Sequence, residues 1–262
     1  MKLLNRIGAR AIRASTLVDR GFARFNSLRS RLVMLIGGDG LFDAYNAVAY
    51  GRTPEYRADR PGFRRELFRW EEDVIERWFP PPPARVLVGG AGGGRELLKL
   101  AELGYTVVGF EPSVELARTL AHDAGAPRVE MYLGRYEALP IVRRLDDRTP
   151  IDLTRQPIFD VGVFGWFSYA HLRTEAQRVA AVRQMAALCR GPILISFYPA
   201  RPHDRRRDTF SVVLGVYHMT DEAEVRQTAD AAGVDVLDVS MDDRDGRWPF
   251  ALLRRRGPMA PG

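Results

Sequence analysis

The residues best suited to bind a ligand form a glycine-rich turn within the stretch RVLVGGAGGGRELLKL, residues 85–100. Five of the six residues from Gly89 to Gly94 are glycine. The turn lies between an apolar run typical of a strand and a pattern typical of a helix. A backbone without side chains allows a ligand to approach the chain closely. The glycines are spaced as Gly90-x-Gly92-x-Gly94, whereas the dinucleotide fingerprint requires its third glycine at position 95, which is arginine.

A second candidate group is the carboxylate of Glu111, which ends the next apolar run, GFEPS. A carboxylate at the end of a second strand can accept hydrogen bonds from both hydroxyls of a ribose. Together with the glycine spacing, this predicts a site for a nucleoside that carries no pyrophosphate. The alternative is an ordinary tight turn beside a solvated glutamate.

Alternating strand and helix patterns place both groups in an α/β fold. We expect a doubly wound, mostly parallel sheet that is covered by helices on both faces. Strands are expected over residues 85–90, 105–112, 128–134, 158–166, 192–199, 234–243 and 247–256. Helices are expected over residues 94–104, 113–125, 174–191 and 220–233, the last with Thr220 as its cap. In such a sheet, ligands bind at the carboxyl ends of the strands, where the strand order reverses.

The chain ahead of this pattern is expected to form a separate region. We predict an N-terminal helical extension and cap over residues 1–83, which ends at the proline run FPPPPAR, and a main domain over residues 84–262. Residues 1–36 combine an apolar arc with an arginine-rich arc and contain a single acid, Asp19. This pattern fits a helix on an anionic membrane surface, an organelle transit peptide, or a helix that packs on the domain or on a second subunit.

Composition narrows the class of protein. The 262 residues include one cysteine, Cys189, which excludes an internal disulfide framework and fits a cytoplasmic location, with membrane-peripheral or organelle placement as alternatives. The net charge of +6 would suggest anionic partners, but nearly all basic residues are arginine, which weakens that inference. We expect no transmembrane segment, because no run of about 18 apolar residues occurs. We also expect no metal site, since the histidines are scattered.

From residue 84 onward, the motifs resemble those of class I S-adenosylmethionine-dependent methyltransferases. VLVGGAGGGRELLKLAELGYTVVGFEPSVELARTLA resembles the first two motifs of the family, and YLGRYEALP, FDVGVFGWFSYAHL and FALLRRR resemble later ones. The resemblance covers about two thirds of the chain. It implies a seven-stranded sheet with an antiparallel last strand, S-adenosyl-L-methionine as cofactor, and methyl transfer.

The resemblance also implies the residues that would bind the cofactor. They are Gly90, Ala91, Gly92, Gly94, Glu111, Pro112, Arg135, Tyr136, Glu137 and Gly165. Two positions depart from the family pattern. Val88 stands where many members have an acid that helps to bind the ammonium group, and Arg135 stands where an aspartate is common. Tyr136 and Glu137 are then expected to border the adenine.

Residues for the acceptor are expected on loops that follow the strands. His171 is the preferred general base, with a capping or supporting role as the alternative, and Tyr169 could orient a hydroxyl or amine. Candidate substrate-binding residues, with core packing or solvent exposure as the alternative, are Tyr45, Tyr50, Trp166, Tyr198, His203, Tyr217 and His218.

The leading interpretation is a methyltransferase acting on an oxygen or nitrogen of a small molecule. One alternative is a nucleic-acid methyltransferase, but no stacking or base-flipping module is evident. Another is a non-catalytic cofactor-binding protein docked on a membrane or partner. The N-terminal helix could also contact a membrane peripherally or form a homodimer.

Overall fold

The computed structural model describes residues 56, 57, 61, 63, 66–123, 129–200, 218–244 and 247–257. The chain divides into two compact units, Met1–Tyr45 and Asn46–Gly262, and the first lies outside the described residues. The predicted helix over residues 1–36 thus lies outside the described residues, and the predicted boundary at residue 83 stays a prediction. None of the described helices is both long enough and apolar enough to cross a membrane.

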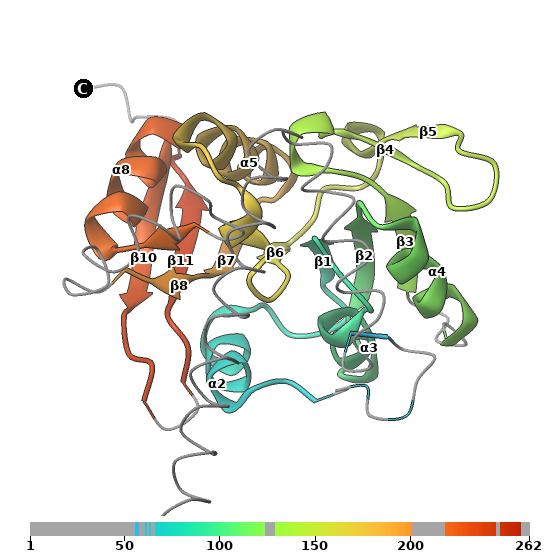
Figure 1. Ribbon diagram of the computed structural model, residues 1–262, viewed down its shortest axis with the longest axis horizontal. Coiled ribbons are helices and arrows are strands. Elements are labelled where there is room, and N and C mark those ends of the chain that lie inside the picture. The colour runs from blue at the N-terminus through green and yellow to red at the C-terminus, as the bar shows by residue number, and fades with distance from the viewer. Residues whose placement is uncertain are drawn as a thin grey trace, which may run out of the picture. The chain divides into compact units, whose positions relative to one another are not determined.

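The described residues form an α/β fold, in which one large sheet carries helices on both faces (Figure 1). The sheet has the strand order β10-β11-β7-β6-β1-β2-β3-β4-β5. Its strands are β1 (Arg85–Gly89), β2 (Thr106–Glu111), β3 (Val129–Leu133), β4 (Ile141–Arg143), β5 (Pro150–Asp152), β6 (Val161–Phe164), β7 (Pro192–Ser196), β10 (Val234–Ser240) and β11 (Phe250–Arg255). A separate parallel ladder joins β8 (Tyr198–Pro199) to β9 (Met219–Thr220).

One helix precedes the first strand, and the others follow strands in the order that the sequence predicts. They are α2 (Arg69–Trp78), α3 (Arg95–Glu102), α4 (Val114–Asp123), α5 (Glu175–Leu188) and α8 (Glu222–Ala232). Short 3₁₀ turns are η2 (Tyr136–Ala138), η3 (Leu153–Arg155) and η4 (Ser168–His171). The start of α8 differs from the prediction, because Asp221 rather than Thr220 caps it by accepting a 2.9 Å hydrogen bond from the Glu224 N–H.

Strand pairing confirms the predicted fold class. β7, β6, β1, β2 and β3 run parallel to one another, and β11 is antiparallel to β7. The predicted count of seven strands is wrong for the described sheet, because an antiparallel hairpin of β4 and β5 extends the edge beside β3. Each of these two strands has only three residues, which is too short for a recognisable apolar alternation.

Two apolar layers lie on opposite faces of the sheet because side chains alternate along each strand. Leu87 of β1 packs in the layer that contains α5 and α8, whereas Val86 and Val88 pack in the layer that contains α2 and α3. Figure 1 shows these helix pairs on opposite sides of the strands. Within the second layer, Trp70 of α2 stacks on Phe250 of β11 at 5.5 Å between ring centroids, so α2 shares the core of the sheet.

Candidate functional site

The glycine turn lies at the point where the strand order reverses. β1 pairs with β2 on one side and with β6 on the other, and the turn leaves the carboxyl end of β1 between them. Gly90, Gly92 and Gly94 have positive φ angles of 61°, 55° and 88°, a conformation that favours glycine. A ligand site is expected at this kind of reversal.

Neighbouring backbone holds the turn on both sides. The Gly165 N–H donates a 2.7 Å hydrogen bond to the Gly89 carbonyl, and the Ala91 N–H donates one of 3.1 Å to the Phe110 carbonyl. Gly165 must be glycine because a Cβ there would lie 2.4 Å from the Gly90 oxygen. A Cβ on Gly92, by contrast, would meet no atom of the described chain within 4 Å. The turn is thus rigid at its base and open at Gly92.

Glu111 binds the open part of the turn. Its Oε2 accepts a 2.8 Å hydrogen bond from the Gly92 N–H, and its Oε1 accepts one of 2.9 Å from the Ser113 N–H. Burial raises the pKa of Glu111 to about 7, although the two N–H groups and the nearby Arg135 charge act in the opposite direction. A carboxylate has about four acceptor positions, so two remain for other donors. This arrangement suits a pair of neighbouring hydroxyl groups.

Tyr136 lies directly against the start of the turn. Its ring stacks on Phe164 at 4.5 Å between centroids, and its hydroxyl lies 2.8 Å from Ser168 Oγ. A Cβ on Gly89 would lie 2.5 Å from Tyr136 Cε1, so this position also requires glycine. Burial raises the pKa of Tyr136 well above its ordinary value. Tyr136 therefore supports the turn from within the core, and its predicted contact with adenine stays a prediction.

The other residues predicted around the cofactor lie at the same edge. Pro112, Arg135 and Glu137 are exposed, and Glu137 accepts a 3.5 Å hydrogen bond from Gln177 of α5. Val88 is fully buried among apolar side chains, so no acid occupies that position. Gly93 is covered by the chain before α2, since a Cβ there would lie 1.9 Å from the Tyr56 carbonyl oxygen.

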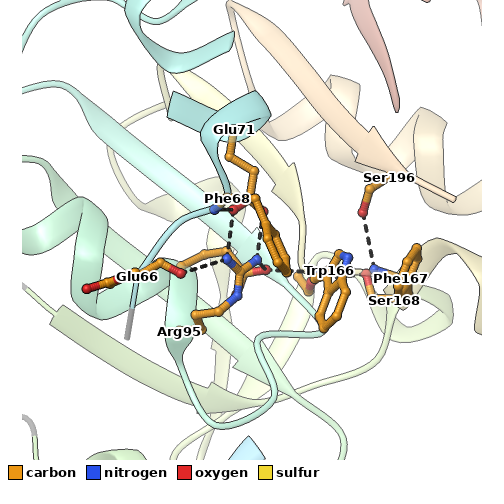
Figure 2. A network of polar contacts seen from close by, with 10 residues as sticks. Glu66, Phe68, Glu71, Arg95, Trp166, Phe167, Ser168 and Ser196 are labelled. Atoms are coloured by element: carbon orange, nitrogen blue, oxygen red, sulfur yellow. Dashed lines mark hydrogen bonds and ion pairs between the residues drawn. The ribbon is translucent and has the colours of Figure 1, made fainter. Parts of the chain in front are cut away.

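A buried ion network begins one residue after the turn (Figure 2). Arg95 donates from Nη1 to Glu71 Oε2 at 2.7 Å and from Nη2 to Glu71 Oε1 at 2.6 Å. The same Nη2 donates to Glu96 Oε1 at 2.9 Å. The guanidinium also lies over the rings of Phe68 and Trp166, at 4.6 and 5.6 Å from their centroids. These contacts tie the first turn of α3 to α2.

The network continues into the loop that follows β6. Glu96 Oε1 accepts a 2.7 Å hydrogen bond from the Trp166 N–H, and Ser196 Oγ accepts one of 3.2 Å from the Phe167 N–H. Phe167 adopts a left-handed conformation with φ of 60°, and its ring stacks on Tyr198 at 4.0 Å. The loop is therefore fixed from α3 on one side and from β7 and β8 on the other.

Tyr169 and His171, the two residues predicted to act on the methyl acceptor, have different environments. Tyr169 is fully buried, and burial raises its pKa to about 12, with Thr228 acting in the opposite direction. Its ring packs edge-on against Phe164, so in this structure it supports the core and does not face solvent. His171, the predicted base, is half-buried at the end of η4. Its catalytic role stays a prediction.

His218 lies beside η4 and has a carboxylate partner. Its backbone N–H donates a 2.7 Å hydrogen bond to the Ala170 carbonyl, and its Nε2 lies 2.5 Å from Glu224 Oε1. Arg178 of α5 also donates to that oxygen, at 2.5 Å. The candidates Tyr45, Tyr50, His203 and Tyr217 lie outside the described residues.

The structure therefore brings together the glycine turn, Glu111, Gly165 and the loop at Trp166, all of which the sequence singles out. Sequence reasoning misses the ion network of Glu71, Arg95 and Glu96. The available signal was Arg95 itself, which occupies the place of a fingerprint glycine, but its partner Glu71 is 24 positions away. Among the described residues, no group of His, Cys, Asp and Glu could hold a metal ion.

Comparison with known proteins gives matches in structure alone. No protein-family model matches the chain, and no curated protein matches it in sequence. Magnesium protoporphyrin IX methyltransferase from Synechocystis PCC 6803, solved with bound SAH, is similar with a TM-score of 0.53 and 15% identity over 71% of this chain and 80% of that one. The CcbJ methyltransferase from Streptomyces caelestis has a TM-score of 0.53 and 18% identity over 71% and 96% of the two chains.

A SAM-dependent methyltransferase from Methanosarcina mazei has a TM-score of 0.54 and 15% identity, over 72% of this chain and 96% of that one. At these identities the likeness establishes the fold. The predicted structural resemblance is confirmed, and the ligand and the reaction must be argued from the site.

Proposed function

We propose that this chain, which has the fold of class I S-adenosylmethionine-dependent methyltransferases, binds S-adenosylmethionine and methylates an oxygen or nitrogen of a small molecule. The observation that carries the proposal is the contact between Glu111 and Gly92. It places a buried carboxylate with two available acceptor positions beside the open part of a glycine turn.

The residues fit a nucleoside better than a dinucleotide. Glu111 offers acceptors for two ribose hydroxyls, and the space at Gly92 is open. Arg95 occupies the position where the dinucleotide-binding fingerprint requires its third glycine. Its side chain is held there by hydrogen bonds to Glu71 and Glu96. When bound, S-adenosylmethionine supplies a methyl group that is already activated by a sulfonium.

The task of the protein is then to position the reactants. Proximity and alignment can lower a barrier of this kind by about 7–11 kcal/mol. The loop at Trp166 and Phe167 is held by Glu96, Ser196 and the Tyr198 ring, so it provides a fixed wall beside the turn. Trp166 and Tyr198 are the residues on this wall that we propose contact the acceptor.

A general base is needed only if the acceptor must lose a proton. His171 ends η4, and His218 lies beside the same turn with Nε2 bonded to Glu224. A histidine oriented by a carboxylate can take up a proton on its second ring nitrogen. We therefore propose His171 and His218 as the two candidates for this role.

The similar structures support a small-molecule acceptor. Those solved under the names magnesium protoporphyrin IX methyltransferase, mitomycin 7-O-methyltransferase and CalO1 of calicheamicin biosynthesis carry small-molecule substrates or products in their names. The chain spans about half the length of the last two proteins, 53% and 54%. These names guide the choice of acceptors for an assay.

The test is direct binding followed by turnover. The full chain is titrated with S-adenosylmethionine and, separately, with NAD, and is then incubated with S-adenosylmethionine and panels of phenols, carboxylic acids and amines. We expect binding of the methyl donor and release of S-adenosylhomocysteine with at least one panel. Binding of NAD without binding of the methyl donor would overturn the proposal.

A further inference from the structure

We propose that Glu96 is a specificity-determining residue whose negative charge makes the site favour the positively charged methyl donor over its product. This inference rests on the proposed function. S-adenosylmethionine carries a sulfonium, and its product S-adenosylhomocysteine carries a neutral thioether. The donor therefore has one positive charge more than the product.

The first observation is an excess of negative charge in the buried network. Arg95 is the single cation that bonds both carboxylates, Glu71 and Glu96. The three side chains are between 5% and 8% exposed. One positive charge against two negative charges leaves one carboxylate without a matching cation among the described residues, and burying such a charge is costly.

Hydrogen-bond donors surround both carboxylates. Both oxygens of Glu71 accept from Arg95, and Oε2 also accepts from the Phe68 N–H at 2.8 Å. Glu96 Oε1 accepts from Arg95 and from the Trp166 N–H. Every one of these partners is a donor, which matches the acceptor oxygens of a carboxylate. Both acids also lie in the first turn of a helix, where the helix dipole stabilises negative charge.

The second observation concerns the free oxygen of Glu96. Both hydrogen bonds to this side chain end on Oε1, and within the described part of the chain no donor reaches Oε2. Glu71 is different, because Arg95 engages both of its oxygens. Of the two carboxylates, Glu96 is therefore the one with an oxygen that receives no hydrogen bond from the described residues.

The third observation is where Glu96 lies. It follows Gly94, the last glycine of the turn, by two residues, and it holds the backbone N–H of Trp166. Gly165, the residue before Trp166, packs its backbone on Gly90. Glu96 thus joins the two loops that border the proposed cofactor site. An unmatched carboxylate at this junction favours a ligand with positive charge.

The test compares two ligands on two variants. Glu96→Gln removes the charge and keeps a carbonyl oxygen that accepts from Arg95 and Trp166. Glu102→Gln is the matched control, since Glu102 ends the same helix, is half-exposed and pairs with Lys99 at 3.1 Å. Calorimetry measures the Kd for S-adenosylmethionine and for S-adenosylhomocysteine in the wild-type chain and in both variants.

We expect Glu96→Gln to weaken binding of the methyl donor by about tenfold and binding of the product by less than about twofold. Glu102→Gln should change neither Kd. Equal weakening of both ligands would reduce Glu96 to a structural role and overturn the inference, as would no change in either.

Failure of the proposed function gives a different result. A wild-type chain that binds neither ligand contradicts methyl transfer itself and removes the basis of this inference. A wild-type chain that binds both ligands while Glu96→Gln keeps their ratio unchanged leaves methyl transfer intact and refutes only the role of Glu96. Thermal unfolding of each variant establishes that it is folded in the titrations.

Discussion

Glu111 accepts a 2.8 Å hydrogen bond from the backbone N–H of Gly92, across 19 positions of the chain. This contact fixes the open part of the glycine turn relative to the end of β2. Glu111 is buried, with a relative exposure of 6%. A ligand that bonds Glu111 and lies along the turn would therefore meet a site whose two halves are already held together.

The pKa of Glu111, raised to about 7 by burial, predicts a pH dependence of cofactor binding. The ribose hydroxyls need the ionised carboxylate, so the chain must release a proton when it binds ligand at low pH. The affinity for S-adenosylmethionine should be highest above pH 7 and fall by up to about tenfold for each pH unit below it. Calorimetry from pH 5 to pH 8.5 measures this dependence.

Glu111→Gln provides the control for that profile. It keeps one carbonyl acceptor and cannot ionise, so binding should be weaker at pH 8 and should lose the slope below pH 7 that the carboxylate causes. Any slope that remains in the variant belongs to the ligand or to other groups. The same slope in both proteins would show that another group controls the titration.

Two adjacent glycines should respond differently to alanine. Gly92→Ala introduces a side chain into open space but at φ of 55°, which costs about 1–2 kcal/mol. Gly93→Ala places a Cβ 1.9 Å from the Tyr56 carbonyl oxygen, so the segment before α2 must move. We expect greater protease sensitivity of that segment in Gly93→Ala alone. Equal sensitivity in both variants would contradict the packing of Tyr56 on the turn.

Arg95→Met should destabilise the fold strongly. It leaves Glu71 and Glu96 buried without their cation, and loss of one partner from a buried ion pair typically costs about 3–5 kcal/mol. The matched control is Arg226→Met, because Arg226 forms an exposed pair with Glu222 and should matter by less than about 0.5 kcal/mol. Urea denaturation gives both free energies of unfolding.

The loss in Arg95→Met should depend on pH. Burial already raises the pKa of Glu71, with the charge of Glu96 acting in the same direction, and without Arg95 this pKa rises further. When an acid has a higher pKa in the folded chain than in the unfolded chain, the fold loses stability as the pH rises from the unfolded pKa to the folded pKa. The variant should therefore be closest to the wild type at acidic pH. A pH-independent difference would contradict the unpaired-charge explanation.

The hydroxyls of Tyr136 and Ser168, 2.8 Å apart, should act as a pair. Tyr136→Phe and Ser168→Ala each remove one partner and should each cost about 1–3 kcal/mol, because the remaining hydroxyl is buried. The double variant should cost at least about 0.5 kcal/mol less than the sum of the two. Strict additivity in urea denaturation would contradict a direct bond.

The sequence predicts the central strands, the order of helices and the position of Glu111 because these depend on local patterns. Val86, Leu87 and Val88 form a continuous buried run, and Gly94 has the positive φ angle that a tight strand-to-helix turn requires. Glu111 follows from its place at the end of the next such run. These features need no knowledge of distant contacts.

Contacts between distant residues could not be predicted in this way. Glu96 meets the Trp166 N–H across 70 positions, and nothing near either residue in sequence indicates the other. The packing of the Tyr136 ring between Phe110 and Phe164, beneath the turn, likewise has no signal in the local sequence. The hairpin of β4 and β5 is recognisable only through its pairing with β3, since each of its strands has only three residues.

Calorimetry on the wild-type chain and on Glu111→Ala at pH 8 measures whether Glu111 and the glycine turn bind the nucleoside of S-adenosylmethionine. We expect binding by the wild-type chain and a loss of at least about tenfold in the variant, since two charge-assisted hydrogen bonds are removed. The same affinity in both proteins, with the variant folded, would contradict it.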